Sequence, residues 1–156
     1  MPSRVLVAIR VAVTPERAFA AFTGEIDVWW RPNGLFHFTP RGPGRLTFEP
    51  GSGGRLIETQ PDGRVFEIGR ITVWKPPSEL GFDWRQASFE PQQKTEVRVH
   101  FEAAGSETRV TVEHVGWDAI PQEHAARHGF PIDVFLRRLA EWWQALLARY
   151  AARVAR

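Results

Sequence analysis

The chain has no cysteine, and this absence narrows its chemistry. It excludes disulfide bonds, thiolate metal ligands and a cysteine nucleophile. Long apolar runs are lacking too, since no stretch approaches the roughly 18 apolar residues of a membrane-spanning helix. The start, MPSRVLVAIRVAVTP, lacks a sustained apolar segment followed by a small-residue cleavage site. We therefore expect a cytoplasmic protein with no membrane partner.

The net charge of the chain is also small. Lys and Arg number 20 and Asp and Glu number 18, which leaves a formal charge of +2. The cations are almost all arginine and are scattered among acids, so the electrostatic footprint of a nucleic-acid-binding protein is missing. We expect no nucleic-acid partner. With 43% apolar and 24% charged residues, close to the globular average, the chain is expected to fold as one domain over 1–156.

Periodicity and capping residues predict the first elements. Apolar residues alternate over 4–13, as in a strand. Thr14 and Pro15 are typical of a helix start, and the apolar spacing that follows indicates a helix that ends at Gly24. A second short helix is expected over 26–30, before Pro and Gly break it.

The remainder of the chain reads as a meander followed by helices. From Gly44 to Val115, short alternating runs are separated by clusters of Gly, Pro, Asp and Ser, which favours sequential antiparallel pairing. A short helix is expected over 121–129. A long amphipathic helix is expected from Pro131 to about Val154. Strand, two helices, meander and helix together indicate an α+β fold.

Several stretches carry a family resemblance. They are the tryptophan pair in EIDVWWRP, then GPGRLTFEPGSGGRLIE, GRITVWKPPSELGFDW, TEVRVHFEAAGSETRVTVEHVGWDAIP and the tryptophan-bearing terminal helix. In this order and spacing they resemble the START-like (SRPBCC) superfamily, and within it the Aha1-like group, named after activators of a heat-shock-protein ATPase. The resemblance covers almost the whole chain.

The resemblance implies a helix-grip fold. In this fold a curved antiparallel sheet of six to seven strands wraps around a long C-terminal helix, with two short helices after the first strand and a ligand cavity between sheet and helix. It does not imply a particular reaction, because the superfamily includes lipid carriers, hormone binders, cyclases and co-chaperone domains.

Aromatic residues provide the candidate site. Seven tryptophans and eleven phenylalanines are more than ordinary packing of one sheet and three helices needs. Strand alternation puts several of them on faces that should look at the terminal helix. The resemblance favours a pocket wall over a filled core, which periodicity alone does not distinguish. The predicted ligand-binding residues are Trp30, Phe48, Phe66, Trp84, His114, Trp117 and Phe135.

His114 is the most specific of these residues. It alternates with Val110 and Val112, so its titratable ring should point into apolar space. The ring could hydrogen-bond a ligand carbonyl or carboxylate, act as a general acid or base, or be a core residue with satisfied hydrogen bonds. The sequence leaves these three alternatives open.

Two further histidines, His124 and His128, lie four residues apart in QEHAARHG. On a helix they would share one side, as a zinc-binding pair does. The pattern is incomplete, since Ala125 stands where a metallopeptidase has its glutamate and no third ligand is evident nearby. We therefore expect a solvated helix here, and neither a metal nor a cofactor.

Two other pairs carry weaker hypotheses. One ring of Trp29 and Trp30 is expected to be buried and the other exposed, as a lid at the cavity mouth or an anchor for a partner. Glu58 and Glu67 lie on neighbouring predicted strands and could form a carboxylate pair in the pocket. A register difference of one residue would turn either of them outward.

The leading functional hypothesis is a non-enzymatic module that binds a small hydrophobic or aromatic molecule. The first alternative is an enzyme that resembles the polyketide cyclases and uses His114 with a pocket carboxylate; it ranks lower because no nucleophile-base set is visible. The second is a chaperone-regulating domain with a role in the stress response. It is expected to fail, because the family's chaperone activators usually carry an additional N-terminal domain. Edge strands near Val5 and Phe48 would permit a homodimer as well as a monomer.

Overall fold

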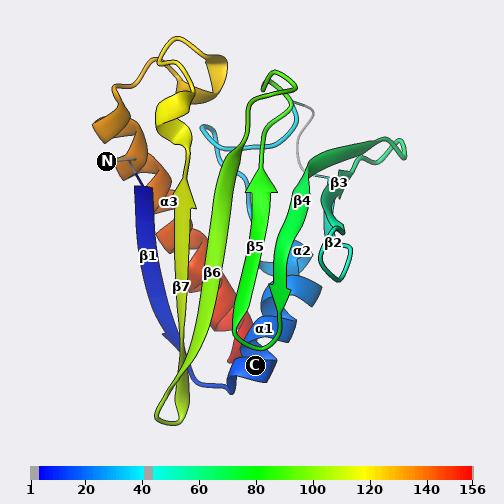
Figure 1. Ribbon diagram of the computed structural model, residues 1–156, viewed down its shortest axis with the longest axis vertical. Helices are drawn as coiled ribbons and strands as arrows, with labels where there is room; N and C mark the ends of the chain where they lie inside the picture. Colours follow the sequence, from blue (N-terminus) through cyan, green and yellow to red (C-terminus); the bar gives the residue numbers. More distant parts are fainter. Residues whose placement is uncertain (1–3, 41–43, 156) are drawn as a thin grey trace.

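The computed structural model describes residues 4–40 and 44–155. Its elements follow the predicted order (Figure 1). The strands are β1 (Arg4–Val11), β2 (Arg45–Phe48), β3 (Arg55–Thr59), β4 (Val65–Lys75), β5 (Glu79–Trp84), β6 (Thr95–Ala104) and β7 (Glu107–Val115). The helices are α1 (Pro15–Gly24), α2 (Ile26–Trp29) and α3 (Ile132–Val154), with short 3-10 helices η1 (Trp117–Ala119) and η2 (Ala125–Arg127).

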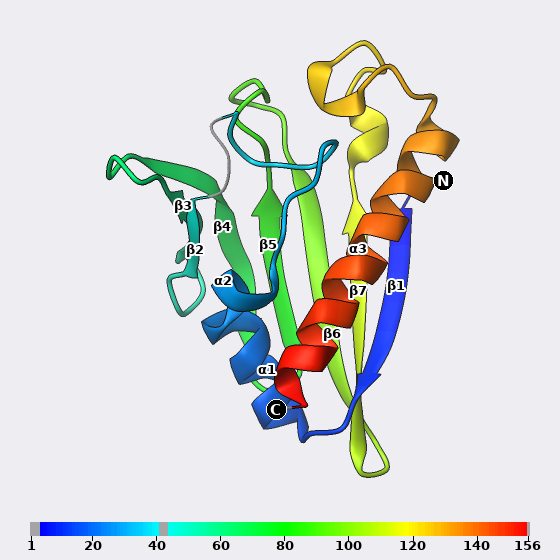
Figure 2. The ribbon, with the colours of Figure 1, turned by 180° about the vertical axis from the view of Figure 1, so that it is seen from behind.

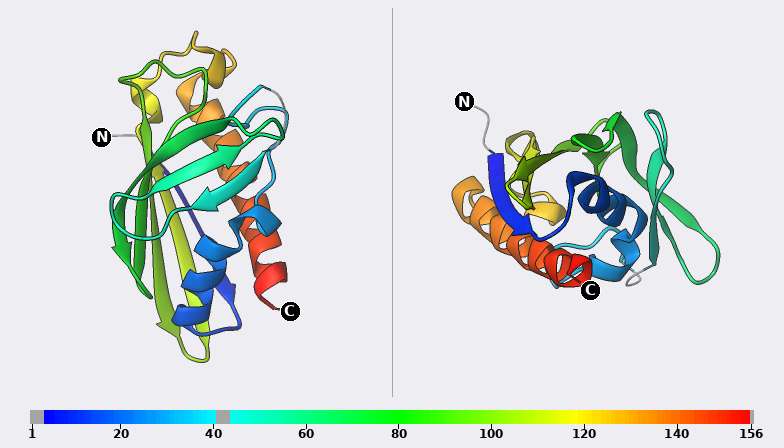
Figure 3. Two further views of the ribbon diagram at one scale, coloured as in Figure 1. Left: turned by 90° about the vertical axis from the view of Figure 1, so that its right-hand side faces the viewer. Right: turned by 90° about the horizontal axis from the view of Figure 1, so that it is seen from below.

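The seven strands form one antiparallel sheet in the order β1-β7-β6-β5-β4-β3-β2. Strands β2 to β7 make the predicted meander, and β1 pairs with the last of them. Figure 3 shows the sheet curling, with the helices on its concave side. α3 has 23 residues, crosses this side diagonally (Figure 2) and spans about 35 Å. The predicted α+β helix-grip architecture, a curved antiparallel sheet around a long C-terminal helix with two short helices after the first strand, is confirmed.

Local sequence explains where α1 begins. The Thr14 hydroxyl accepts a hydrogen bond from the backbone N–H of Arg17 at 3.3 Å, and Pro15 is the first helical residue, as predicted. β1 stops short of the predicted Val13. The carbonyl of Val13 accepts a hydrogen bond from the Thr108 hydroxyl at 2.7 Å, and this side-chain contact replaces the backbone hydrogen bond that a neighbouring strand would donate.

The segment between β7 and α3 differs from the prediction. In place of the helix predicted over 121–129, these residues form only the 3-10 helix η2. The Nδ1 atom of His124 accepts a hydrogen bond from the N–H of Ala126 at 3.0 Å, and His128 leaves the helical region with a φ of 53°. Because η2 ends after Arg127, His124 and His128 do not share one side of an α-helix, as a zinc-binding pair would.

Two changes of register bend β4. Its register with β3 shifts after Leu56, and its register with β5 shifts after Ile71. Such bulges increase the local twist and bend of a strand. Gly69 lies between them, and a Cβ at this position would clash with the carbonyl oxygen of Asp83. The close approach requires glycine, and the bend carries β3 and β2 round to the side where β2 packs on α2.

The concave side of the sheet and the inner face of α3 form the core. The strand faces that were predicted to look at the terminal helix are buried: Leu80, Phe82 and Trp84 on β5, Val97, Val99 and Phe101 on β6, and Val110, Val112 and His114 on β7. Within the described residues, no helix is both long and apolar enough to cross a membrane.

Both rings of the Trp29-Trp30 pair are buried, at 1% and 4% exposure, so the expectation that one would be exposed is wrong. α2 is a single turn that ends at Trp29, and Trp30 continues in an extended conformation (φ −74°, ψ 135°). This change of backbone direction turns both rings inward. The Trp29 ring lies 4.8 Å from Phe22 and 5.3 Å from Tyr150, and the Trp30 ring lies 5.3 Å from Trp143.

Candidate ligand-binding site

The structure divides the seven predicted ligand-binding residues into groups. Trp84, His114, Trp117 and Phe135 form a buried aromatic layer between sheet and α3, Trp30 lies beside this layer, and Phe48 and Phe66 lie apart from it. The Phe48 ring packs on Phe82, with centroids 5.2 Å apart. Phe66 is half-buried and lines a hollow of about 520 Å³ beside β4.

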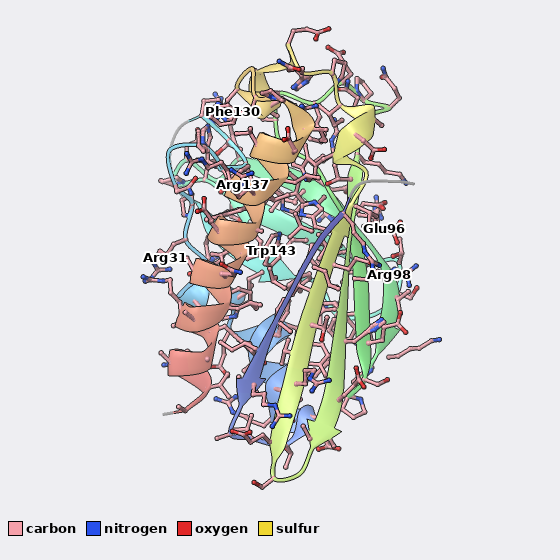
Figure 4. All side chains as sticks on the ribbon, turned by 90° about the vertical axis from the view of Figure 1, so that its left-hand side faces the viewer. Arg31, Glu96, Arg98, Phe130, Arg137 and Trp143 are labelled. Atoms are coloured by element: carbon pink, nitrogen blue, oxygen red, sulfur yellow. The ribbon has the colours of Figure 1, made fainter. Side chains whose placement is uncertain are left out.

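His114 is held at both ring nitrogens. Its Nε2 atom lies 2.7 Å from the hydroxyl of Thr95 on β6 and 3.1 Å from the indole nitrogen of Trp117. Its Nδ1 atom lies 3.1 Å from the indole nitrogen of Trp143, which projects from α3 towards the strands (Figure 4). One imidazole therefore joins β6, β7, η1 and α3.

The same burial fixes the charge of His114. Its ring has no exposed surface, and this desolvation lowers its pKa from 6.5 to about 3. The imidazole is therefore neutral near pH 7. A general acid or base is most effective when its pKa is close to the working pH, so this environment does not suit the proton-transfer role among the three alternatives.

Two aromatic rings separate the buried layer from the surface. The rings of Trp30 and Phe38 stack on each other, with centroids 5.7 Å apart and planes inclined by 26°. On their inner side, Phe38 lies 5.3 Å from Trp84 and Trp30 lies 5.3 Å from Trp143. On their outer side they line a pocket, which we call the α2–β2 pocket.

The α2–β2 pocket has a volume of about 300 Å³. Its described lining is Asp27, Trp30, Arg31, Pro32, Phe38, Gly44, Leu46 and Glu58. The two stacked rings and Leu46 are almost fully buried and supply an apolar wall. Arg31 is exposed, and its side chain donates hydrogen bonds to the backbone carbonyls of Asp27 and Trp30. The pocket is thus apolar against the core and polar at its rim.

Glu58 is the buried polar group of this pocket, at 5% exposure. Its Oε1 atom accepts hydrogen bonds from the Thr39 hydroxyl at 2.6 Å and from the Gln60 amide at 2.7 Å. Both of these donors bind Oε1, so neither of them occupies the lone pairs of Oε2. A carboxylate placed in this way offers an acceptor to a ligand hydroxyl or amine.

The hypothesised pair of Glu58 and Glu67 is not formed. Glu58 is the cross-strand partner of Phe66, whereas Glu67 is the partner of Ile57. Adjacent positions on a strand point to opposite faces, so the two carboxylates lie on opposite sides of the β3–β4 hairpin. Glu67 instead lies 3.4 Å from the guanidinium of Arg70.

The paired histidines are not a metal site either. His124 caps η2, and the Nε2 atom of His128 lies 2.7 Å from the carbonyl oxygen of Leu35, where it ties the 117–131 segment to the loop before β2. Across the described residues, no group of three or more His, Cys, Asp or Glu side chains is arranged to hold a metal ion.

Sequence reasoning missed Trp143, Thr95 and Phe38. Trp143 lies on the apolar side of the predicted terminal helix, so its indole N–H needs an acceptor in the core. Since His114 was predicted to lie in the core, the sequence contained the information for this contact. Thr95 begins a predicted strand, and its contact with His114 depends on the pairing of β6 with β7. Phe38 lies in an irregular loop, which gives no periodic signal.

A curved antiparallel sheet around a long C-terminal helix is the fold of START-like helix-grip proteins. A model of the family described as "Activator of Hsp90 ATPase homolog 1-like protein" matches residues 12–152. The chain therefore belongs to this family, and the resemblance inferred from sequence is confirmed. No curated protein matches the chain.

Solved structures share the fold. Protein MLL2253 from Mesorhizobium loti is 18% identical, with 96% of this chain and 95% of that chain covered and a TM-score of 0.66. DynU16, from the dynemicin biosynthetic locus, is 18% identical over 96% of this chain and 46% of that chain, with a TM-score of 0.65. Txn09, described as an anthrahydroquino-gamma-pyrone synthase, is 28% identical over 97% and 96% of the two chains, with a TM-score of 0.57.

Proposed function

We propose that this protein binds a small hydrophobic or aromatic molecule in the α2–β2 pocket, against the rings of Trp30 and Phe38. One observation carries the proposal: a buried carboxylate, Glu58, shares a pocket with two stacked aromatic rings that are themselves buried. Concave apolar sites with one or a few fixed polar groups are the usual form of small-molecule sites in proteins.

The physical basis of binding is apolar burial with one orienting contact. Burying the ligand's own apolar surface against Trp30, Phe38 and Leu46 contributes about 25 cal/mol per Å² before the costs of association, whereas these side chains expose little surface of their own. The pocket volume of about 300 Å³ lies at the small end of ligand sites, which favours a compact ring system over a long-chain lipid. Glu58 orients the ligand by accepting a hydrogen bond from its hydroxyl or amine.

A cyclase-like enzyme is the second candidate. The observation in its favour is the 28% identity to the pyrone synthase over nearly the whole of both chains. The neutral, enclosed ring of His114 argues against the histidine mechanism that the sequence suggested. If the protein is an enzyme, Glu58 is the residue of the α2–β2 pocket that is placed to move a proton.

A chaperone-regulating role has weaker support. Over residues 4–40 and 44–155, the large apolar side chains that are exposed are Leu6 on β1, Val28 on α2 and Val65 at the start of β4, three separate elements. An interaction surface would favour a contiguous apolar patch of several hundred Å². The family description is the remaining argument for this role.

The test uses the tryptophan indole N–H signals as position markers. Protein labelled with ¹⁵N at its seven tryptophans is titrated with a library of hydrophobic and aromatic compounds, after native mass spectrometry has checked for a co-purified molecule. Binding in the pocket shifts the Trp30 indole signal and leaves that of Trp74, which packs on Phe19, unchanged.

Two matched variants then test the location. Leu46→Ala removes a wall of the pocket, and we expect it to weaken binding about tenfold. Leu56→Ala removes a buried leucine of the adjacent strand that does not line the pocket, and we expect it to lower stability without changing the affinity. If the whole library leaves every indole signal in place, or if both variants weaken binding equally, the proposal is wrong.

A further inference from the structure

The buried aromatic layer contains more hydrogen-bond donors than acceptors. Trp84, Trp117 and Trp143 each bury an indole N–H in this layer, and Trp84 and Trp117 have ring centroids 5.3 Å apart. An indole nitrogen only donates. Among the residues that the structure describes, the Trp84 N–H has no hydrogen-bond partner, and the other two both point at His114.

His114 cannot accept from both indoles. A neutral imidazole has one nitrogen that accepts and one that carries a hydrogen. The Thr95 hydroxyl lies 2.9 Å from the carbonyl oxygen of Trp84 and 2.7 Å from Nε2 of His114. If it donates to the carbonyl, it accepts from Nε2–H, and the imidazole hydrogen is then on Nε2.

In that tautomer Nδ1 accepts from Trp143, and the N–H of Trp117 faces a nitrogen that already carries hydrogen. In the other tautomer Nε2 accepts from Trp117, and the N–H of Trp143 is left without an acceptor. Either tautomer therefore leaves one indole N–H unsatisfied in addition to that of Trp84. Each such donor destabilises the fold, because on burial it loses its hydrogen bond to water and gains none in return.

A ligand that brings its own acceptor would satisfy these donors. A neutral carbonyl oxygen has two lone pairs and can accept from two N–H groups at once. It fits the layer better than a carboxylate does, because the neutral imidazole supplies no charge to pair with an anion.

Phe38 supplies the route from the surface. Its ring touches Trp84 on one side and lines the α2–β2 pocket on the other. It lies in the irregular segment between α2 and β2, so its side chain can rotate without breaking a strand or helix.

We propose that the bound molecule is an aromatic ketone, quinone or pyrone, whose carbonyl oxygen enters past Phe38 and accepts hydrogen bonds from the indole N–H groups of Trp84 and Trp117. This inference rests on the proposed function and adds the chemical class of the ligand. The aromatic rings of such a molecule stay against Trp30 and Phe38, in the pocket.

The experiment compares 9-fluorenone with fluorene, two tricyclic probes of nearly equal size that differ by the carbonyl group. Binding is measured by calorimetry and by the tryptophan indole signals. We expect fluorenone to bind about tenfold more tightly, which corresponds to one or two net hydrogen bonds. Its addition should also shift the Trp84 and Trp117 signals downfield.

Three variants assign the donors. Trp84→Phe and Trp117→Phe keep an aromatic ring and remove the N–H, and each should reduce the preference for fluorenone. Trp142→Phe is the matched control, because its N–H donates to the carbonyl of Arg31 at 2.9 Å, outside the layer. It should keep the preference.

The stabilities of the variants without ligand give an independent readout. Trp84→Phe removes a donor that has no partner, so it should lower the midpoint of urea unfolding less than Trp142→Phe does. If both probes bind equally well to every variant, the carbonyl inference is wrong while the proposed function stands. If neither probe nor any library compound binds, both are wrong.

Discussion

The indole nitrogen of Trp143 lies 3.1 Å from Nδ1 of His114, which joins α3 to β7 by a hydrogen bond inside the core. The other ring nitrogen faces Thr95 on β6. These contacts fix the orientation of the imidazole, and burial keeps it neutral near pH 7 by lowering its pKa.

The free energy of unfolding should decrease as the pH is lowered, because of His114. Burial lowers its folded-state pKa from 6.5 to about 3, so between these values the unfolded chain binds a proton that the folded protein does not. The contribution is fully present above the unfolded pKa and is lost as pH falls below it. Between about pH 7.5 and about pH 5 we expect a loss of about 2 kcal/mol, measured by urea unfolding.

His114→Gln is the control for this prediction, because glutamine keeps polar atoms at the site and does not titrate. The variant should be less stable at neutral pH, and its stability should change less over the same range. The difference between the two curves isolates His114 from the other ionisable groups. Parallel curves would contradict the prediction.

Arg127 should stabilise the segment between β7 and α3. The residue is 4% exposed, and its guanidinium donates to the carbonyls of Ile120 at 2.7 Å and Phe130 at 2.6 Å, with its centre 5.3 Å from the Phe135 ring. Lysine has no planar fork to reach both carbonyls, so Arg127→Lys should cost about 2 kcal/mol. Hydrogen exchange should speed up mainly over residues 117–131.

Arg137→Lys is the matched control for Arg127→Lys, since Arg137 lies on the exposed side of α3 (Figure 4). It should change the free energy of unfolding by about 0.5 kcal/mol or less. Equal effects of the two substitutions would mean that the buried guanidinium has no special structural role.

The fold could be predicted because its signals are local and periodic. Thr14 and Pro15 mark the start of α1, and apolar residues every second position mark the strands. The apolar side of the last helix repeats every three or four residues, from Phe135 to Val154. Such patterns depend on the backbone of each element alone, and the family resemblance supplied the way in which the elements pack.

The site could be predicted only in part, because its contacts join elements that are distant in sequence. Strand alternation was enough to place His114 in the core, but its contact with Trp143 depends on how far α3 is rotated against the sheet. The position of Phe38 depends on an irregular loop. The helix predicted between Pro121 and Gly129 is absent, because the 3-10 helix η2 ends after Arg127, where His128 takes a positive φ.

Glu25 should contribute about 1 kcal/mol to stability at neutral pH. Its carboxylate accepts hydrogen bonds from Arg17 on α1 and, at 2.8 Å, from Arg153 in the last turn of α3. The hydrogen bond from Arg17 lowers the pKa of Glu25, so this stability is present above the ordinary value of 4.5 and is lost as pH falls through the lowered one.

Urea unfolding of Glu25→Gln at neutral pH tests the pairing. The effect should shrink at about 1 M salt, because the two arginine side chains are partly exposed and their charges are screened. Glu16→Gln, in the first turn of α1, is the control and should show a smaller loss. A Glu25→Gln loss that does not respond to salt would point to packing instead of charge.

Gly69 and Gly24 should respond to alanine in opposite directions. At Gly69 a Cβ would clash with the carbonyl oxygen of Asp83, so Gly69→Ala must push β4 away from β5 and should cost about 3 kcal/mol or more. At Gly24, the last residue of α1, no atom lies within 4 Å of the added Cβ. There alanine should stabilise the protein by about 0.5–1 kcal/mol, because it reduces the freedom of the unfolded chain. Thermal and urea unfolding measure both effects.

Because the bend at Gly69 brings β2 and β3 to α2, Gly69→Ala should also abolish the shift of the Trp30 indole signal on ligand binding, whereas Gly24→Ala should preserve it. A Gly69→Ala protein with wild-type stability and ligand response would show that the close contact of β4 with β5 does not shape the pocket.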